Sequence, residues 1–399
     1  CQGATSANLT YSATTGTEYK INFDETAEGQ GFVDVPYTNL TTSPIVITVP
    51  SGAGAGAYNA TLQVKNASGC ESVGYAISVT VNALPTITLG TNPSVCQGAT
   101  SANLTYSATT GTEYKIDFND AANAAGFVDV TYTTLPTSQI VIAVPSGAGA
   151  GTYNATLQVK NASGCESNVY NISVTVRALP TATLTATTPN VCYNGTATYS
   201  VTLTGTPNWT LRYWNGASDV TVSGITSSPY TITINNATAD LNYKITEVSD
   251  AHCTNTTDGS TVQINVYDQF TAGGIQIEGE TICSGGDPGV IGSSTDASGG
   301  DEAITYKWQS STDGGETWSD IDGSNAETYN PGTLTQTTKF QRLAHDGACS
   351  TSFVASDGLW TVTVEQPAIA PTITPSPAAG TICEGTLVSA TFSGGSGGN

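Results

Sequence analysis

The chain has 399 residues, and its 32 Asp and Glu against 10 Lys and Arg give a formal net charge of −22. This excess of acid argues against nucleic acid and anionic membranes as partners, because both are bound through patches of Lys and Arg. Only 11% of the residues are charged and only two are His, so we expect neither a disordered acidic tail nor an enzyme.

Short segments that favour strands follow one another along the first part of the chain. They lie at residues 9–12, 19–23, 32–35, 45–49, 58–65 and 76–81, with turn residues between them, and apolar and polar residues alternate in the last two. Alternation with a period of two is the pattern of a half-buried strand, and no segment has the periodicity of a capped helix. With a leading strand at residues 86–89 in the next repeat, the pattern predicts an all-β fold of immunoglobulin-like β-sandwich modules with about seven strands each.

The same sequence then recurs. The segment that opens at Cys1 returns at Cys96, and the segment from Val49 to Ser72 returns from Val144 to Ser167. The offset of 95 residues is too long for one unit of a solenoid, but it suits a small all-β domain. The repeat therefore predicts a linear array of separately folded modules.

The spacing of the cysteines extends the array beyond this duplication. Cys1 and Cys70 are separated by the same length of chain as Cys96 and Cys165, and two further pairs follow with slightly shorter spacings. We therefore predict four modules, at residues 1–83 (lacking its first strand), 84–178, 179–267 and 268–366, and the start of a truncated fifth at residues 367–399. The absence of Met and the start inside a module lead us to expect a segment of a longer protein.

Regular cysteine spacing within modules favours disulfides formed in an oxidising compartment. The first cysteine lies at the start of a module and the second in the loop before its last strand, and we expect the two to meet at one end of the sandwich. The predicted pairs are Cys1–Cys70, Cys96–Cys165, Cys192–Cys253 and Cys283–Cys349. Cys383 is expected to be unpaired because of the truncation. No Cys-x-x-Cys occurs, so we predict no metal site at these residues.

Two motifs carry a resemblance to known proteins. A Tyr-led strand that ends in Asn-x-x-Gly-Cys resembles PKD-type and other immunoglobulin-like modules. The fourth module, through residues 281–286, 306–318 and 328–332, resembles the tandem modules of giant cell-surface adhesins of Bacteroidota, including gliding-motility adhesins exported by the type IX secretion system.

The resemblance implies a non-catalytic repeat stalk that gives reach and mechanical stability for surface attachment or gliding. It implies an extracellular location, associated with the outer membrane. The implied partners are an extracellular surface or polysaccharide, reached through the parent protein, and the secretion and motility machinery. Lateral self-association of the stalks is a further expectation, and no cofactor is expected.

The aromatic residues leave an alternative function open. Trp308 occupies a strand position at which the simplest interpretation is a core aromatic between two sheets. The other four tryptophans would be the platforms if the modules bound polysaccharide, or if they were accessory modules of a secreted carbohydrate-active enzyme: Trp209, Trp214, Trp318 and Trp360. Exposed rings would favour this alternative, and buried rings would weaken it.

Clusters of carboxylates leave calcium as a second alternative. They comprise Asp24, Glu25, Glu28 and Asp34 in the first module, Asp117, Asp120 and Asp129 in the second, and Asp313, Glu316, Asp320 and Asp322 in the fourth. None has the spacing of an EF-hand loop. The near-identical second module does not keep the set, so we interpret these residues as solvated acidic loops.

Overall fold

The computed structural model describes residues 1–12, 14–376, 383–385 and 387–395. The chain divides into two compact units, Cys1–Leu179 and Pro180–Asn399. Both consist of β-sandwich modules, which confirms the predicted all-β, immunoglobulin-like fold. In the part of the chain that is described, no helix has the length and apolar character needed to cross a membrane.

The first module contains a two-stranded and a four-stranded sheet. Its elements are β1 (Ser6–Leu9), β2 (Glu18–Phe23), α1 (Glu25–Glu28), β3 (Val35–Asn39), β4 (Ile45–Thr48), β5 (Gly56–Lys65) and β6 (Tyr75–Val81). β1 pairs with β4, and the larger sheet has the order β3-β2-β5-β6. Alternate residues such as Ile21 and Phe23 of β2 and Ile45 and Ile47 of β4 are buried together, so the two sheets share one apolar core.

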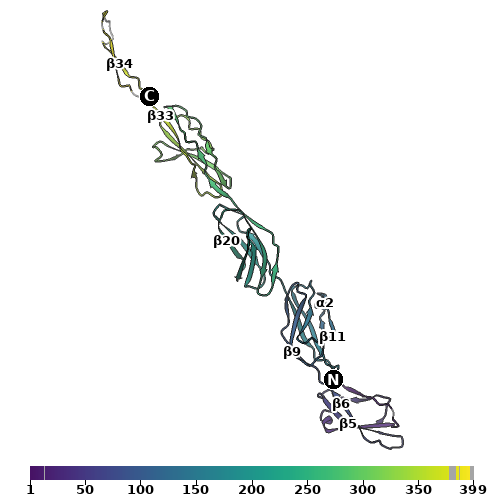
Figure 1. The fold of residues 1–399 in the computed structure, drawn as a ribbon. Coiled ribbons are helices and arrows are strands. Elements are labelled where there is room, and N and C mark those ends of the chain that lie inside the picture. The colour runs from purple at the N-terminus through teal and green to yellow at the C-terminus, as the bar shows by residue number, and fades with distance from the viewer. Residues whose placement is uncertain (13, 377–382, 386, 396–399) are drawn as a thin grey trace. The chain divides into compact units, whose positions relative to one another are not determined.

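The second module repeats this plan and completes it. Its elements are β7 (Ile87–Leu89), β8 (Ser94–Cys96), β9 (Ser101–Thr109), β10 (Glu113–Phe118), α2 (Asp120–Ala124), β11 (Val130–Thr134), β12 (Gln139–Ala143), β13 (Gly151–Lys160) and β14 (Tyr170–Arg177). The sheets have the orders β12-β9-β7 and β11-β10-β13-β14-β8, and Figure 1 labels β9 and β11 as members of the two. The short helices α1 and α2 were not predicted, because four or five residues are too few to show a helical period.

The third module has a three-stranded and a six-stranded sheet. Its strands are β15 (Ala182–Ala186), β16 (Asn190–Val191), β17 (Gly195–Leu203), β18 (Trp209–Trp214), β19 (Asp219–Ile225), β20 (Tyr230–Ala237), β21 (Leu241–Ser249), β22 (Thr254–Thr256) and β23 (Val262–Val266). The smaller sheet has the order β15-β17-β20, and the larger the order β16-β23-β21-β18-β19, with β22 paired to β21. The buried rings of Tyr199, Tyr213 and Tyr243 stack in the core between them.

The fourth module has one large sheet and two short pairs of strands. Its strands are β24 (Asp268–Thr271), β25 (Gly274–Ile275), β26 (Glu280–Cys283), β27 (Ser293–Thr295), β28 (Ser298–Gly300), β29 (Thr305–Ser311), β30 (Ser319–Asp320), β31 (Thr338–His345), β32 (Val354–Ala355) and β33 (Trp360–Glu365). The large sheet has the order β26-β33-β31-β29-β30, with β32 paired to β31. Trp308 on β29 is fully buried, which confirms it as a core aromatic; its ring stacks on Tyr329 and its indole nitrogen donates to the carbonyl of Ala326 at 3.0 Å.

The fourth module contains a fully buried arginine, and this burial was not predicted from the sequence. Arg342 on β31 is fully buried, although its neighbours in the sequence alternate as in any strand. Its Nη2 donates to the carbonyls of Ala272, Gly274 and Thr295 at 3.3–3.4 Å. The guanidinium therefore ties the large sheet to the short strands packed on it.

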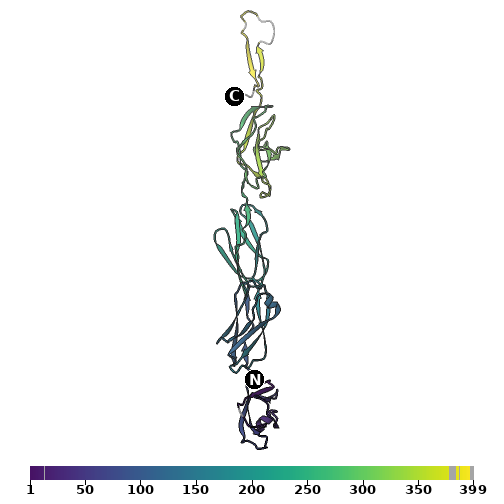
Figure 2. The same cartoon turned by 90° about the vertical axis from the view of Figure 1, so that its right-hand side faces the viewer.

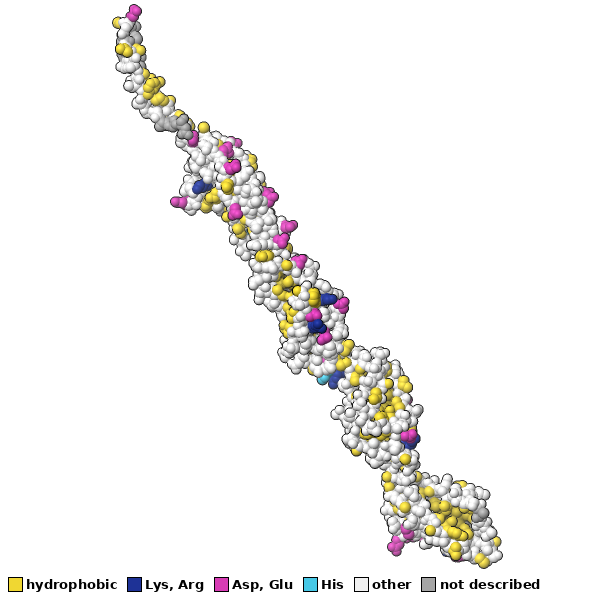
Figure 3. Space-filling model, in the orientation of Figure 1, with side chains coloured by type: hydrophobic (Ala, Val, Ile, Leu, Met, Phe, Trp, Pro, Cys, Tyr) yellow, Lys and Arg dark blue, Asp and Glu magenta, His cyan; other side chains and the backbone are white. Residues whose placement is uncertain are grey.

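The last described element is a hairpin, seen as two neighbouring strands in Figure 2. It pairs β34 (Thr372–Ser376) with β35 (Ser389–Ser393). Parts of the predicted fifth module, at residues 377–382, 386 and 396–399, lie outside the described residues. In Figure 3 acidic side chains are dispersed among uncharged ones over the visible face, as expected from a charge of −22 with few charged residues.

Candidate functional site: disulfide joints between modules

Within each complete module, the strand that leads to the first cysteine lies at an edge and runs parallel to the last strand. β8 pairs with β14 so that Cys96 lies beside Arg177, the final residue of β14. In the fourth module β26 pairs with β33, and Cys283 lies beside Glu365, the final residue of β33. The first cysteine is therefore at the end of the sandwich where the chain leaves the module.

The second cysteine is at the opposite end. Cys165 lies in the loop between β13 and β14, just before β14 begins at Tyr170. β14 is eight residues long, so its two ends are separated by about 24 Å. A disulfide requires Cα atoms about 4.4–6.8 Å apart. Cys96 and Cys165 therefore cannot bond to one another within one module.

The structure pairs cysteines of successive modules instead. Cys1 of the first module is bonded to Cys165 of the second, with their Cα atoms 5.5 Å apart. Cys192 of the third is bonded to Cys349 of the fourth, also with 5.5 Å between the Cα atoms. The predicted pairs Cys1–Cys70, Cys96–Cys165, Cys192–Cys253 and Cys283–Cys349 are therefore wrong. Spacing along the chain had shown that the cysteines form a repeating set, but not the end of the sandwich at which each one lies.

The other cysteines fall into two groups. Cys96 and Cys253 are disulfide-bonded as well. Cys70 and Cys283 are exposed free thiols in this structure, although both had been predicted to form disulfides. The prediction that Cys383 is unpaired because of a truncation stays a prediction.

Polar contacts surround the bond between Cys1 and Cys165. The side-chain oxygen of Asn161 accepts from the backbone N–H of Cys165 at 3.0 Å, and its amide nitrogen donates to the carbonyl of Ala83 at 3.1 Å. The backbone N–H of Gln2 donates to the carbonyl of Asn82 at 2.9 Å. One asparagine therefore holds both the cysteine loop of the second module and the linker that precedes that module.

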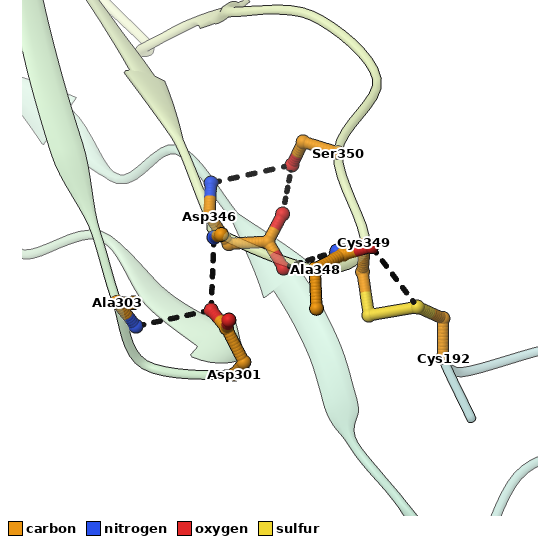
Figure 4. The surroundings of a disulfide bond; sticks show 8 residues. Cys192, Asp301, Ala303, Asp346, Ala348, Cys349 and Ser350 are labelled. Atoms are coloured by element: carbon orange, nitrogen blue, oxygen red, sulfur yellow. Dashed lines mark hydrogen bonds between the residues drawn. A yellow bond between two sulfur atoms is a disulfide. The ribbon is translucent and has the colours of Figure 1, made fainter. Parts of the chain in front are cut away.

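A carboxylate does the equivalent work beside the bond between Cys192 and Cys349 (Figure 4). The carboxylate of Asp346 accepts from the backbone N–H of Cys349 at 2.8 Å and from the hydroxyl of Ser350. The neighbouring Asp301 accepts from the backbone N–H of Gly347 at 2.9 Å. These bonds fix the loop that presents Cys349 to Cys192.

The buried Asp346 is charged at neutral pH. Its burial works to raise the pKa of the carboxyl, but hydrogen bonds from Ser350 and from the backbone N–H of Cys349 outweigh it, so the pKa lies below its ordinary value. The same balance lowers the pKa of Asp250 in the third module, where burial is opposed by backbone N–H groups of Thr206, Cys253 and His252.

An Asn or Asp thus precedes the second cysteine by three or four residues in every module. Asn66 accepts from the backbone N–H of Cys70 at 3.0 Å, as Asn161 does from Cys165. Asp250 accepts from the backbone N–H of Cys253 at 2.7 Å. Sequence reasoning noticed the Asn-x-x-Gly-Cys turn but not its Asp-x-x-Cys equivalent, which a comparison of the residues before each second cysteine would have revealed.

Some of the carboxylates considered for calcium have structural partners within the chain. Asp24 accepts from the N–H of Ala27 at the start of α1, and Asn119 takes the same role at α2. Asp313 accepts from the backbone N–H groups of Glu316 and Thr317 at 3.0 Å. Among the residues described, no group of three or more His, Cys, Asp or Glu could hold a metal ion. Calcium binding stays an untested alternative.

The tryptophans considered as polysaccharide platforms are divided by burial. Trp209 and Trp360 belong to the cores of the third and fourth modules. Trp318 is half-buried, and Trp214 is 36% exposed at the end of β18. A platform of several exposed rings is therefore not formed by this set.

Part of the chain matches a known family. Residues 271–366, which cover most of the fourth module, match a domain of unknown function (DUF8696). No curated protein matches the chain.

Solved structures of tandem domains resemble the chain at low identity. One is a Ca2+-stabilized adhesin of an Antarctic bacterium that binds ice, with 16% identity, a TM-score of 0.38, and coverage of 91% of this chain and 95% of the other. Another is the titin I-band fragment I67-I69, with 11% identity, a TM-score of 0.39, and coverage of 72% and 100%. A third contains immunoglobulin domains 1-5 of Sidekick-1, with 14% identity, a TM-score of 0.31, and coverage of 92% and 78%. These similarities concern the type of domain and give no information on a ligand.

Proposed function

We propose that this chain is a non-catalytic stalk of a bacterial cell-surface adhesin, in which successive modules are joined both by the peptide chain and by disulfides. The observation that carries the proposal is the pairing of Cys1 with Cys165 and of Cys192 with Cys349. A disulfide between neighbouring modules restrains the joint, whereas one within a module stabilises only that module. A restrained joint is useful in a protein that must hold a binding part away from a surface.

Several features support an extracellular place for this stalk. Disulfides persist in oxidising compartments and are rare in the cytosol. The dispersed negative charge disfavours association of repeated sandwiches through their strand edges. The resemblance of residues 281–286 and 306–318 to adhesin modules of Bacteroidota supports the finer proposal of an outer-membrane adhesin, exported by type IX secretion and used in attachment or gliding.

Intact cells of the source organism provide the test. Antibodies raised against the purified chain should label unpermeabilised cells, and their Fab fragments should reduce attachment of the cells to glass. Labelling that requires permeabilised cells would overturn the proposed location. Normal attachment of cells coated with saturating Fab would overturn the adhesive role.

Polysaccharide binding is the competing function, and Trp214 is the exposed ring that favours it. The purified chain should not be retained by insoluble polysaccharides such as cellulose, chitin or xylan. If it is retained, and the substitution Trp214→Ala abolishes retention while Trp318→Ala does not, then these modules bind ligand directly and are not only a stalk.

A further inference from the structure

The two intermodule disulfides create a short covalent route through the chain. The bond from Cys1 to Cys165 closes a loop across 164 residues, and the bond from Cys192 to Cys349 closes one across 157 residues. Between Cys165 and Cys192 lie the loop at residues 166–169, β14, the linker after it and the first two strands of the third module. A covalent path from Cys1 to Cys349 therefore passes through two disulfides and residues 165–192 alone.

We propose that this route bears the tension when the protein is pulled from its ends, and that it makes the part of the chain between Cys1 and Cys349 nearly inextensible. Residues 2–164 and 193–348 lie in closed loops, so their unfolding cannot lengthen the molecule between Cys1 and Cys349. Fully extended, the segment from Cys165 to Cys192 spans about 95 Å. The modules could lose their fold under load without releasing the length stored in them.

The segment on the route is well anchored in its sheet. It includes β14, which is hydrogen-bonded to β13 on one side and to β8 on the other. The side chains of Ile172, Val174 and Val176 on β14 are buried in the core of the second module. Load on this strand is thus resisted by two ladders of backbone hydrogen bonds and by packing, before the chain itself becomes taut.

The short covalent path results from which cysteines are paired and not from the number of disulfides. Four disulfides within modules, as first predicted from the sequence, would leave every segment between successive disulfides on the path. The fully extended path would then measure about 490 Å from end to end. The observed pairs leave residues 165–192 and 349–399, which extend to about 280 Å at most. A chain without disulfides extends to about 1,400 Å. Cys96 and Cys253 are also disulfide-bonded, and a further cross-link cannot lengthen this path.

Single-molecule force spectroscopy on the full chain, held by enzymatically attached tags at its two ends, tests the proposal. The oxidised chain should reach an end-to-end distance of no more than about 280 Å, and reduction should increase this roughly five-fold. A limit of about 490 Å for the oxidised chain would show pairing within modules. No change on reduction would show that disulfides do not limit the length. Either result would overturn the proposal, whatever the cellular role of the protein.

Two variants complete the design. The double substitution Cys192→Ser and Cys349→Ser removes one step of the route, and should lengthen the oxidised chain by several hundred ångströms. The matched control, Cys70→Ser and Cys283→Ser, removes two exposed thiols that are not on the route and that could exchange with its disulfides. It should leave the limit of the oxidised chain unchanged. If the oxidised control chain extended as far as the first variant, the proposed route would be contradicted.

Discussion

The buried Arg342 offers a sharp test of how the fourth module is held together, through the substitution Arg342→Met. Methionine retains much of the apolar volume but donates no hydrogen bonds. The carbonyls of Ala272, Gly274 and Thr295 would each lose a donor. An unsatisfied buried polar group costs about 1–3 kcal/mol. Because several such groups lose their donor together, we expect the free energy of unfolding of this module to fall by about 3–5 kcal/mol.

The matched control is Arg212→Met in the third module. Arg212 also lies on a strand, but its partner is a carboxylate, Asp219 at 2.7 Å, and its side chain is 47% exposed. An exposed ion pair of this kind contributes about 0–1 kcal/mol. The control therefore compares the loss of a buried arginine with the loss of an exposed one.

Native-state hydrogen exchange, read by mass spectrometry on peptides of β29 and β31, measures the effect in the fourth module alone. Amides there should exchange roughly 100- to 5,000-fold faster in Arg342→Met than in the unmodified chain, since each step of about 1.4 kcal/mol is a factor of ten. Peptides of β21 should be unchanged. An acceleration below ten-fold, or one no larger than that caused by Arg212→Met in its own module, would refute the reasoning.

Three further outcomes follow from the geometry of the cysteines and of Asp346. Iodoacetamide should alkylate Cys70 and Cys283 in the native, unreduced chain, because both thiols are exposed; protection of either would contradict their placement. The pKa of Asp346 is lowered in the folded state, so its contribution to stability is present above about pH 4 and is lost as the pH falls through the folded-state pKa. Asp346→Asn should therefore lower the melting temperature at pH 7 and have less effect at pH 2.5, and an equal effect at both values would argue against a charged role. Gly300→Ala should destabilise the same region, because a Cβ there would overlap the Asp346 carboxylate at a φ of +62°; an unchanged melting temperature would count against this packing.

Much of the fold follows from local sequence patterns. The alternation in β6, where Val79 and Val81 are buried and Thr80 between them is exposed, shows which face of a strand is buried. The repeat that begins again at Cys96 shows that the same sandwich is built a second time. The burial of Trp308 was predictable for the same reason, because a large aromatic on a regular strand has a core to fill.

The joints were only partly predictable, because the alternation along a strand carries no information on which strand lies beside it or in which direction. The cysteines were recognised as one repeating set, yet their pairing depends on β8 running parallel to β14 and β26 parallel to β33. That register places the two cysteines of a module at opposite ends. The burial of Arg342 was hidden for a related reason, since its acceptors lie up to 70 residues away along the chain. The sequence alone determined the all-β modules and their repetition; the tertiary structure decided which modules are covalently joined, because pairing depends on where the ends of strands meet in space.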